Sequence, residues 1–234
     1  MSKKTFLIAG GSSGIGLELV KKLSKEGHEV WVVSRTGDSL AGLPGVRHLA
    51  KDVLRDDLPE SELPGLLHGV AYCPGSITLK PFRSLKPETF LEDFQINVLG
   101  AVKVLQAAHK AMKQTGQASA VLFSTVAVSQ GMPFHASIAA AKAAVEGLTR
   151  SLAAEWAPAI RVNCIALSLT DTPLAGRLLA TPDKREAGAA RHPLKRVGTA
   201  AEIAALAAFL LSEDAGWMTG QVIGADGGMS AVRV

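Results

Sequence analysis

Hydrophobic residues along the chain fall into two patterns that alternate, and together they predict strands separated by helices. Short apolar, β-prone runs predict seven strands, at residues 5–9, 29–34, 47–51, 69–73, 119–124, 160–167 and 221–225. Apolar positions that recur every three or four residues predict helices from Leu17 to Gly27 and over residues 87–113, 137–156 and 200–211. Strands that alternate with helices indicate a doubly wound parallel sheet, whose ligands bind beyond the carboxyl ends of the strands. We therefore expect an α/β fold, one domain over residues 1–234, with a seven-stranded parallel sheet covered by helices on both faces.

Two segments depart from this alternation. Pro59 and Pro64 interrupt the segment between the third and fourth strands, so this side of the sheet should be thinly covered. Residues 172–193 have a looser pattern, helical in parts, with leucines at positions 174, 178 and 179. We expect this second segment to form a lid over a mainly apolar pocket.

Composition narrows the class of protein. The chain is 47% hydrophobic and 20% charged, as in globular proteins, and its net charge of +4 is too small and scattered for a nucleic-acid surface. The longest apolar run, residues 203–211, is too short to cross a bilayer, and Lys3 and Lys4 lead into no secretory signal. Cys73 and Cys164 lie in apolar runs, which favours reduced thiols, and the six histidines lack metal-ligand spacing. We expect a cytoplasmic protein with a small-molecule substrate and without metal, membrane or nucleic-acid partners.

A glycine-rich turn joins the first predicted strand to the first predicted helix. Glycines let the backbone approach phosphates, and the amides and dipole of a helix N-terminus neutralise their charge. The spacing Gly10-x-x-x-Gly14-x-Gly16 differs from the common G-x-G-x-x-G, and no Gly-Lys-Ser/Thr of a Walker loop follows. The turn predicts a dinucleotide site of the Rossmann type, although a turn without a ligand is the alternative. The residues expected to hold the pyrophosphate are Gly10, Ser12, Ser13, Gly14, Ile15 and Gly16.

The end of the second predicted strand indicates which dinucleotide binds. An acidic residue there would hydrogen-bond the ribose of NAD, whereas an arginine accommodates the 2′-phosphate of NADP. The chain has Ser34, Arg35 and Thr36 at this place, and no acid before Asp38. These residues favour NADP(H) over NAD(H). The alternative is that Arg35 is a solvated loop charge.

Taken together, these motifs resemble the short-chain dehydrogenase/reductase family along nearly the whole chain, and in particular its 3-oxoacyl-acyl carrier protein reductase-like branch. Asn97 in Ile-Asn-Val-Leu-Gly, Lys142 in Ala-Ala-Ala-Lys and Thr172 before proline match family motifs. The resemblance implies that Asn97 belongs to the active site, that Lys142 binds the nicotinamide ribose and that Thr172 binds the carboxamide end. It also places four further residues at the cofactor: Asp52 and Val53 at the adenine ring, and Cys73 and Gly75 in the turn after the fourth strand. A homodimer or homotetramer through residues 87–113 and 137–156 is implied as well.

Among the departures from the family pattern, two fall in the family's catalytic set. The family's catalytic tyrosine lies four residues before the lysine, where this chain has Ile138, and its catalytic serine lies thirteen residues earlier, where this chain has Thr125. In the family, the tyrosine gives a proton to the carbonyl oxygen of the substrate. Ile138 has no proton to give, and the loss of a general acid typically lowers the rate by about 10²–10⁴-fold. Thr125 keeps a hydroxyl. The expected catalytic set is Asn97, Thr125, Ile138 and Lys142.

The missing tyrosine leaves three functions open. The first is an NADP(H)-dependent oxidoreductase for a small or acyl carbonyl or alcohol, whose proton comes from His135 or from a water held by Thr125, Lys142 and Asn97. The second is a cofactor-binding protein without redox activity, such as an inactive subunit or a sensor. The third is a dehydratase or isomerase with His135 or Lys142 as the base. We favour the first, because the rest of the family's cofactor and Asn/Lys framework is intact.

Overall fold

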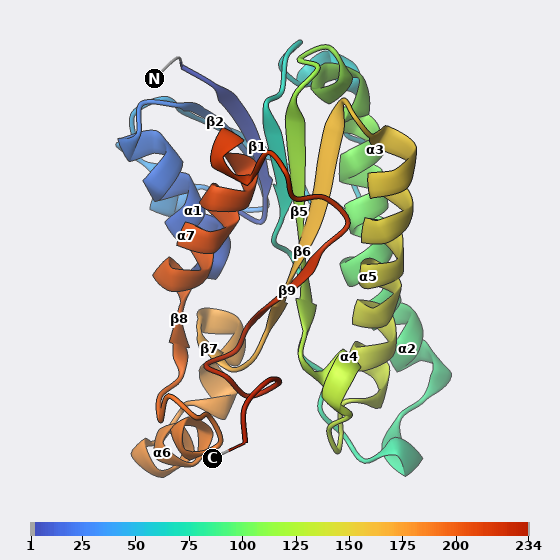
Figure 1. Ribbon diagram of the computed structural model, residues 1–234, viewed down its shortest axis with the longest axis vertical. Helices are drawn as coiled ribbons and strands as arrows, with labels where there is room; N and C mark the ends of the chain where they lie inside the picture. Colours follow the sequence, from blue (N-terminus) through green and yellow to red (C-terminus); the bar gives the residue numbers. More distant parts are fainter. Residues whose placement is uncertain (1–2, 234) are drawn as a thin grey trace.

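The structure is a computed structural model, and it describes residues 3–233. A parallel sheet of seven strands runs through the molecule (Figure 1). In their order across the sheet, the strands are β3 (Val46–Ala50), β2 (Glu29–Ser34), β1 (Thr5–Ala9), β4 (Gly69–Tyr72), β5 (Ala118–Thr125), β6 (Ile160–Leu167) and β9 (Val222–Ala225). The predicted doubly wound α/β fold is confirmed, and the strand ends agree with the prediction to within one residue. The strand order reverses between β1 and β4, where ligands bind in such sheets.

Helices cover both faces of this sheet. Helices α1 (Gly14–Lys25) and α7 (Ala200–Leu211) pack on one face, and α3 (Gly100–Lys113) and α5 (Ala136–Trp156) pack on the other (Figure 1). Each face has its own apolar core, because side chains of a buried strand alternate between the two layers. Between β3 and β4 the chain forms a single 3₁₀ turn, Glu60–Glu62, so the predicted thin cover of this side is also confirmed.

The long helix predicted over residues 87–113 is divided in the structure. Helix α2 (Pro87–Phe94) ends in a π-helical turn, Gln95–Leu99, before α3 begins. The buried hydroxyl of Tyr72 donates to the carbonyl oxygen of Ile96 at 2.5 Å, and a Cβ on Gly100 would lie 2.0 Å from that hydroxyl. The wider turn therefore accommodates a side chain from β4, and it turns Asn97 into the interior, where its exposed fraction is 1%.

A small cap lies beyond the carboxyl ends of the strands, at the bottom of Figure 1. It contains β7 (Thr170–Asp171), a 3₁₀ turn (Pro173–Leu178), α6 (Pro182–Ala190) and β8 (Gly198–Thr199), and the two short strands pair with each other. The short helix α4 (Ala127–Gln130) follows β5 at the same end, and three other 3₁₀ turns lie at Asp38–Leu40, Phe82–Ser84 and Glu213–Ala215. This cap occupies the place expected for the lid. Among residues 3–233, the longest apolar helical stretch still falls short of what a bilayer crossing needs.

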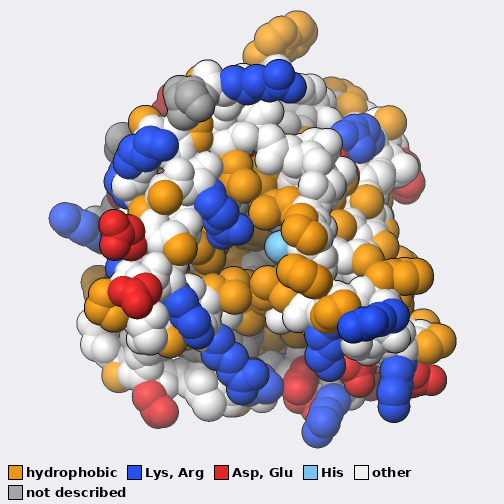
Figure 2. All heavy atoms as spheres, turned by 90° about the horizontal axis from the view of Figure 1, so that it is seen from below, with side chains coloured by type: hydrophobic (Ala, Val, Ile, Leu, Met, Phe, Trp, Pro, Cys, Tyr) orange, Lys and Arg blue, Asp and Glu red, His pale blue; other side chains and the backbone are white. Residues whose placement is uncertain are grey.

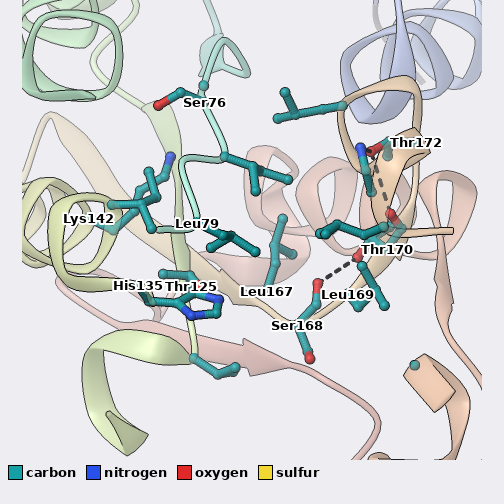
Figure 3. Close-up of a pocket in the computed structure, with 18 of the residues that line it drawn as sticks. Ser76, Leu79, Thr125, His135, Lys142, Leu167, Ser168, Leu169, Thr170 and Thr172 are labelled. Atoms are coloured by element: carbon teal, nitrogen blue, oxygen red, sulfur yellow. Dashed lines mark hydrogen bonds between the residues drawn. The ribbon is translucent and has the colours of Figure 1, made fainter. Parts of the chain in front are cut away.

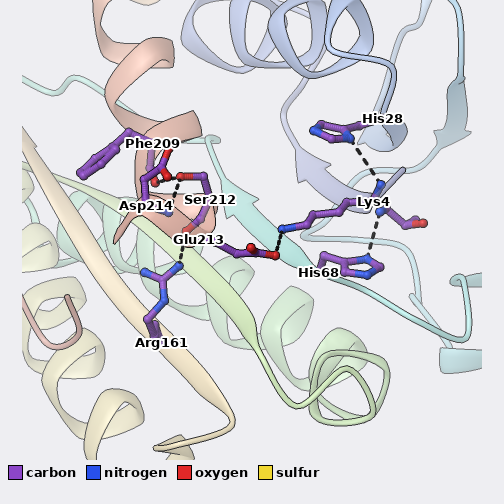
Figure 4. Close-up of polar contacts among 9 residues, drawn as sticks. Lys4, His28, His68, Arg161, Phe209, Ser212, Glu213 and Asp214 are labelled. Atoms are coloured by element: carbon purple, nitrogen blue, oxygen red, sulfur yellow. Dashed lines mark hydrogen bonds and ion pairs between the residues drawn. The ribbon is translucent and has the colours of Figure 1, made fainter. Parts of the chain in front are cut away.

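Two histidines hold the start of β1 (Figure 4). The backbone N–H of Lys4 donates to Nδ1 of His28 at 3.3 Å, and the N–H of Thr5 donates to Nδ1 of His68 at 3.1 Å. The ammonium of Lys4 also pairs with the carboxylate of Glu213 at 2.6 Å. Burial is the main cause that lowers the pKa of both imidazoles, and the nearby Lys4 ammonium acts in the same direction. The folded state therefore prefers both rings neutral.

We expect acid to destabilise the protein through these two rings. Because the pKa of each ring is lower in the folded state, the unfolded state binds more protons as the pH falls below about 6.5, and each proton costs about 1.4 kcal/mol of stability per pH unit. The stability is fully present above that pH and is lost as the pH falls toward the folded-state pKa. Urea unfolding at pH 7.5 and 5.5 measures the loss. In a His28→Asn/His68→Asn variant, whose amides accept the same backbone hydrogen bonds without titrating, the loss should shrink; an equal loss in both proteins would contradict the assignment.

Candidate active site

The glycine turn before α1 is shaped for close contact with a ligand. Gly10 and Gly14 adopt φ angles of +73° and +52°, and a Cβ on Gly16 would lie 2.3 Å from the carbonyl oxygen of Gly10. Ser13 precedes the helix but makes no side-chain cap, so no side chain from this position covers the first amides of α1. A Cβ on Gly14 would lie 3.4 Å from the Cβ of Thr172, which brings the start of the cap beside the turn. This cradle fits a diphosphate.

At the end of β2, one cation is available to a ligand. The hydroxyl of Ser34 donates to the carbonyl oxygen of Thr36 at 2.8 Å and contacts His48. The hydroxyl proton of Ser34 is therefore already engaged within the protein. Within the described residues, Arg35 is exposed and has no hydrogen-bond or ion-pair partner. The hydroxyl of Ser39 donates to the carbonyl oxygen of Ser12 at 2.7 Å, which ties this loop to the glycine turn.

The predicted adenine-binding residues lie in the turn after β3. A carboxylate oxygen of Asp52 accepts the backbone N–H of Leu54 at 2.9 Å, and the backbone N–H of Asp52 donates to Asp56 at 2.7 Å. Val53 packs against the apolar core on the face of the sheet that α3 and α5 cover. Both residues are only partly buried, so they offer a surface at the edge of the cradle.

A cavity of about 570 Å³ opens beyond the carboxyl ends of the strands, and Figure 2 shows it as the hollow at this end of the molecule. Its wall comes from the glycine turn, from the segment after β4, from the end of β5, from the start of α5 and from the cap. Seven of the residues predicted for the site line it: Ile15, Cys73, Gly75, Thr125, Ile138, Lys142 and Thr172. In Figure 3, Lys142, His135 and Thr125 reach it from one side, and Thr170 and Thr172 from the other.

Among the lysines and arginines that line the cavity, Lys142 has the largest shift in pKa. Its ammonium donates to the carbonyl oxygen of Phe123 at 2.8 Å. Desolvation lowers the pKa of Lys142 to about 8, although the nearby carboxylate of Asp93 favours the charged form. Burial raises the pKa of the Cys73 and Cys164 thiols to about 12, so they are neutral at pH 7, and both cysteines are free. Lys142 is therefore able to exchange a proton near neutral pH.

Asn97 lies just behind the cavity wall. A Cβ on Gly75 would lie 3.1 Å from Oδ1 of Asn97 and 3.6 Å from Nζ of Lys142, so both side chains flank this glycine. The amide nitrogen of Asn97 donates to the carbonyl oxygen of Asp93 at 2.7 Å and to Oγ of Ser76 at 2.9 Å. Among the described residues, Oδ1 of Asn97 is a buried acceptor without a donor. Such an atom is normally satisfied by water or a ligand.

The sequence analysis missed the polar network that fixes this amide. The carboxylate of Asp93, only 2% exposed, accepts hydrogen bonds from the hydroxyls of Ser76 at 2.5 Å, Thr78 at 3.1 Å and Ser137. Ser137 directly precedes Ile138, and Asp93 lies one helical turn before Asn97. An acid at that spacing from Asn97 was the available signal, but an acid on a surface helix is normally read as solvated.

The groups that could give a proton are few on this wall. Ile138 lines the cavity and has none to give. Oγ1 of Thr125 accepts the backbone N–H of Ala127 at 3.3 Å, which leaves its own proton for a ligand. Nδ1 of His135 lies 2.7 Å from the carbonyl oxygen of Pro133; a carbonyl only accepts, so Nδ1 carries the hydrogen and Nε2 remains for other contacts. Tyr72 is held by Ile96, outside this wall, and burial raises its pKa.

A cavity at the switch point of a doubly wound sheet, with a glycine cradle at one end and a lysine and an asparagine at the other, defines a class of dinucleotide-dependent enzymes. Comparison with known proteins agrees with this class. A family model described as enoyl-(acyl carrier protein) reductase matches residues 9–230. The chain belongs to the short-chain dehydrogenase/reductase family of oxidoreductases. Within it, the similarity points to the branch of 3-oxoacyl-acyl carrier protein reductases.

Three relatives illustrate the extent of the similarity. The 3-oxoacyl-[acyl-carrier-protein] reductase MabA of Mycobacterium tuberculosis is 33% identical over 231 residues, which cover 97% of this chain and 92% of MabA. A short-chain type dehydrogenase/reductase from Mycobacterium ulcerans has a TM-score of 0.88 at 31% identity and covers 100% of this chain and 92% of its own. ElxO, solved with NADP bound, has a TM-score of 0.88 at 24% identity, and the match covers 99% of this chain and 100% of ElxO. At this identity the similarity shows a shared fold.

Proposed function

We propose that this chain, as one dinucleotide-binding domain over residues 1–234, is an NADP(H)-dependent oxidoreductase acting on a small or acyl carbonyl compound or the matching alcohol. The observation that carries the proposal is a cavity lined by Lys142, Thr125 and Ile15 of the glycine cradle, with the buried Asn97 just behind its wall at Gly75. The exposed Arg35 beyond β2, without a partner among the described residues, supports NADP(H), and the sequence has no acid between it and Asp38. The same fold holds NADP in ElxO.

The cofactor would lie along the carboxyl ends of the strands, and when bound it supplies the hydride. The cradle residues Gly10, Ser12, Ser13, Gly14, Ile15 and Gly16 would hold the diphosphate, Ser34, Arg35 and Thr36 the 2′-phosphate, Asp52 and Val53 the adenine, and Cys73, Gly75, Asn97, Lys142 and Thr172 the nicotinamide half. The unsatisfied Oδ1 of Asn97 and the glycine cradle both fit such a ligand.

The proton would come from a rearranged site, because we place Ile138 in the position of the family's catalytic tyrosine. The free proton of the Thr125 hydroxyl would orient the carbonyl oxygen. Lys142, with its pKa near 8, would deliver the proton through a water held at Oδ1 of Asn97. His135 is the second candidate, since its Nε2 is left for other contacts on the same wall. The hydrocarbon of Ile138 also supports the alternative, a cofactor-binding member that is catalytically impaired or performs no redox step.

Titration with both coenzymes tests the cofactor assignment. We expect NADPH to bind roughly 10–100-fold more tightly than NADH, because a charge-assisted hydrogen bond to phosphate is worth about 1.5–3 kcal/mol. Arg35→Ser should remove most of this preference and leave NADH binding unchanged. Arg47→Ser, which removes an equal charge from the neighbouring strand β3, is the matched control. Isothermal calorimetry measures both affinities in each protein, and tighter binding of NADH than NADPH would refute the assignment.

We also propose that the chain assembles as a homodimer or homotetramer. Leu91, Phe94 and Leu99 expose 61%, 37% and 50% of their surface along α2 and the π-helical turn, in the segment through which the family usually pairs. Trp217 is fully exposed, and Phe209 exposes 40% of its surface on α7. We take these exposed apolar side chains as candidates for interfaces between copies. Sedimentation equilibrium gives the assembly state directly.

A further inference from the structure

The cavity is apolar inside and basic at its rim. Its wall carries leucines, isoleucines and one methionine from the segment after β4, from the loop before α5 and from the cap, among them Ile77, Leu79, Met132, Leu169, Leu174 and Leu178. Figure 2 shows hydrophobic side chains in the hollow and Lys and Arg side chains along its edge. The ligand should therefore have two chemically different ends.

The charged residues of this wall all have one sign. Besides Lys142, they are Arg177, Lys184 and Arg191, all from the cap, and none of the residues lining the cavity is Asp or Glu. In the cap, the carboxylate of Asp171 pairs with Arg185, which does not line the cavity, at 2.6 Å.

The three rim cations have no carboxylate partner. Across residues 3–233, the ion pairs are made by other lysines and arginines. The ammonium of Lys184 donates only to the backbone carbonyl oxygen of Arg177, at 3.3 Å. Three like charges on one rim repel one another, and an anion at the rim relieves this repulsion.

We propose that the substrate is a small amphipathic anion: a carbonyl or alcohol compound with an apolar chain or ring and an acidic headgroup such as a carboxylate or phosphate. The headgroup would bind at Arg177, Lys184 and Arg191, and the apolar part would extend along the leucine-rich wall toward Thr125. This inference deepens the proposed function and rests on it, since the reacting oxygen is taken to lie at Thr125.

Two fluorescent probes that differ only in charge test the inference without turnover. 8-Anilino-1-naphthalenesulfonate carries an acidic headgroup on an apolar ring system, and N-phenyl-1-naphthylamine is the same ring system without it. In protein saturated with NADPH, we expect the sulfonate to bind at least roughly 10-fold more tightly at low salt and to lose this advantage at high salt. Octanoate should displace it at lower concentration than octanol does.

The variant Arg177→Gln/Lys184→Gln/Arg191→Gln should weaken binding of the sulfonate by roughly 10-fold and change binding of the neutral probe by less than about 3-fold. Lys21→Gln/Lys22→Gln/Lys25→Gln, with the same charge change on α1, should alter neither. Equal affinity for both probes, or unchanged sulfonate binding in the cap variant, would overturn the inference while leaving NADPH binding intact. If the cap variant instead loses affinity for NADPH, the three cations serve the cofactor and the inference is wrong.

Discussion

Replacing Ile138 with tyrosine is expected to raise NADPH-dependent reduction of carbonyl compounds by roughly 10²–10⁴-fold, the usual contribution of a positioned general acid. Ile138 lies one helical turn before Lys142 on α5, and both line the cavity beside Thr125. A phenol there would meet the neighbouring ammonium, which lowers the pKa of a phenol and makes its proton easier to give. The cavity of about 570 Å³ has room for the ring.

Ile138→Phe is the matched control for this experiment, because it adds the same ring without the hydroxyl. Oxidation of NADPH against a panel of aldehydes, ketones and 3-oxoacyl thioesters measures the gain. A gain in the tyrosine variant alone indicates that the rest of the reductase machinery is in place. If both variants are equally silent while NADPH still binds, the pocket serves another reaction, and the non-redox alternative is favoured.

Gly16→Ala is expected to lower the affinity for NADPH by about 100-fold, because the added Cβ would lie 2.3 Å from the carbonyl oxygen of Gly10. The contacted oxygen belongs to the backbone and the Cβ is fixed on the backbone, so the turn itself must move, and its amides no longer face a diphosphate. The same overpacking should cost about 1–3 kcal/mol of folding free energy.

The control for this substitution is Gly65→Ala, since a Cβ at Gly65 meets nothing within 4 Å. Its stability should stay within about 0.5 kcal/mol of the parent protein, and its NADPH affinity should not change. Calorimetric titration of NADPH and urea unfolding separate the two effects. Native NADPH affinity in Gly16→Ala would mean that the dinucleotide binds elsewhere.

The sequence predicted the sheet well because each buried strand is a short apolar run closed by a turn signal, and these signals are local. It did not predict the break at Gln95–Leu99, because the cause is the Tyr72 hydroxyl, which comes from a strand more than twenty residues earlier. The two-residue strands β7 and β8 were missed for the same reason: their pairing joins positions 170–171 to 198–199.

For the site, the nearness of several motif residues to one another was predictable, because parallel strands end at one edge and carry those residues there. Seven of the predicted positions do line one cavity. The network around Asp93 was not predictable, since its partners Ser76 and Ser137 come from two other segments. The lowered pKa of Lys142 also follows from burial, which no local pattern reports.

The cap makes few buried contacts with the rest of the protein. Strands β7 and β8 share only a two-residue pairing, and within α6 only Gly188 is buried. The buried residues of the cap include Ala175, Leu179 and His192; His192 donates from Nδ1 to the carbonyl oxygen of Gly188 and accepts at Nε2 from the hydroxyl of Ser168. Segments with so few buried contacts open at a lower free energy than the strands beneath them. Amide hydrogens of the cap should therefore exchange with solvent before those of the sheet, and the rate at which products depart would be governed by this local opening.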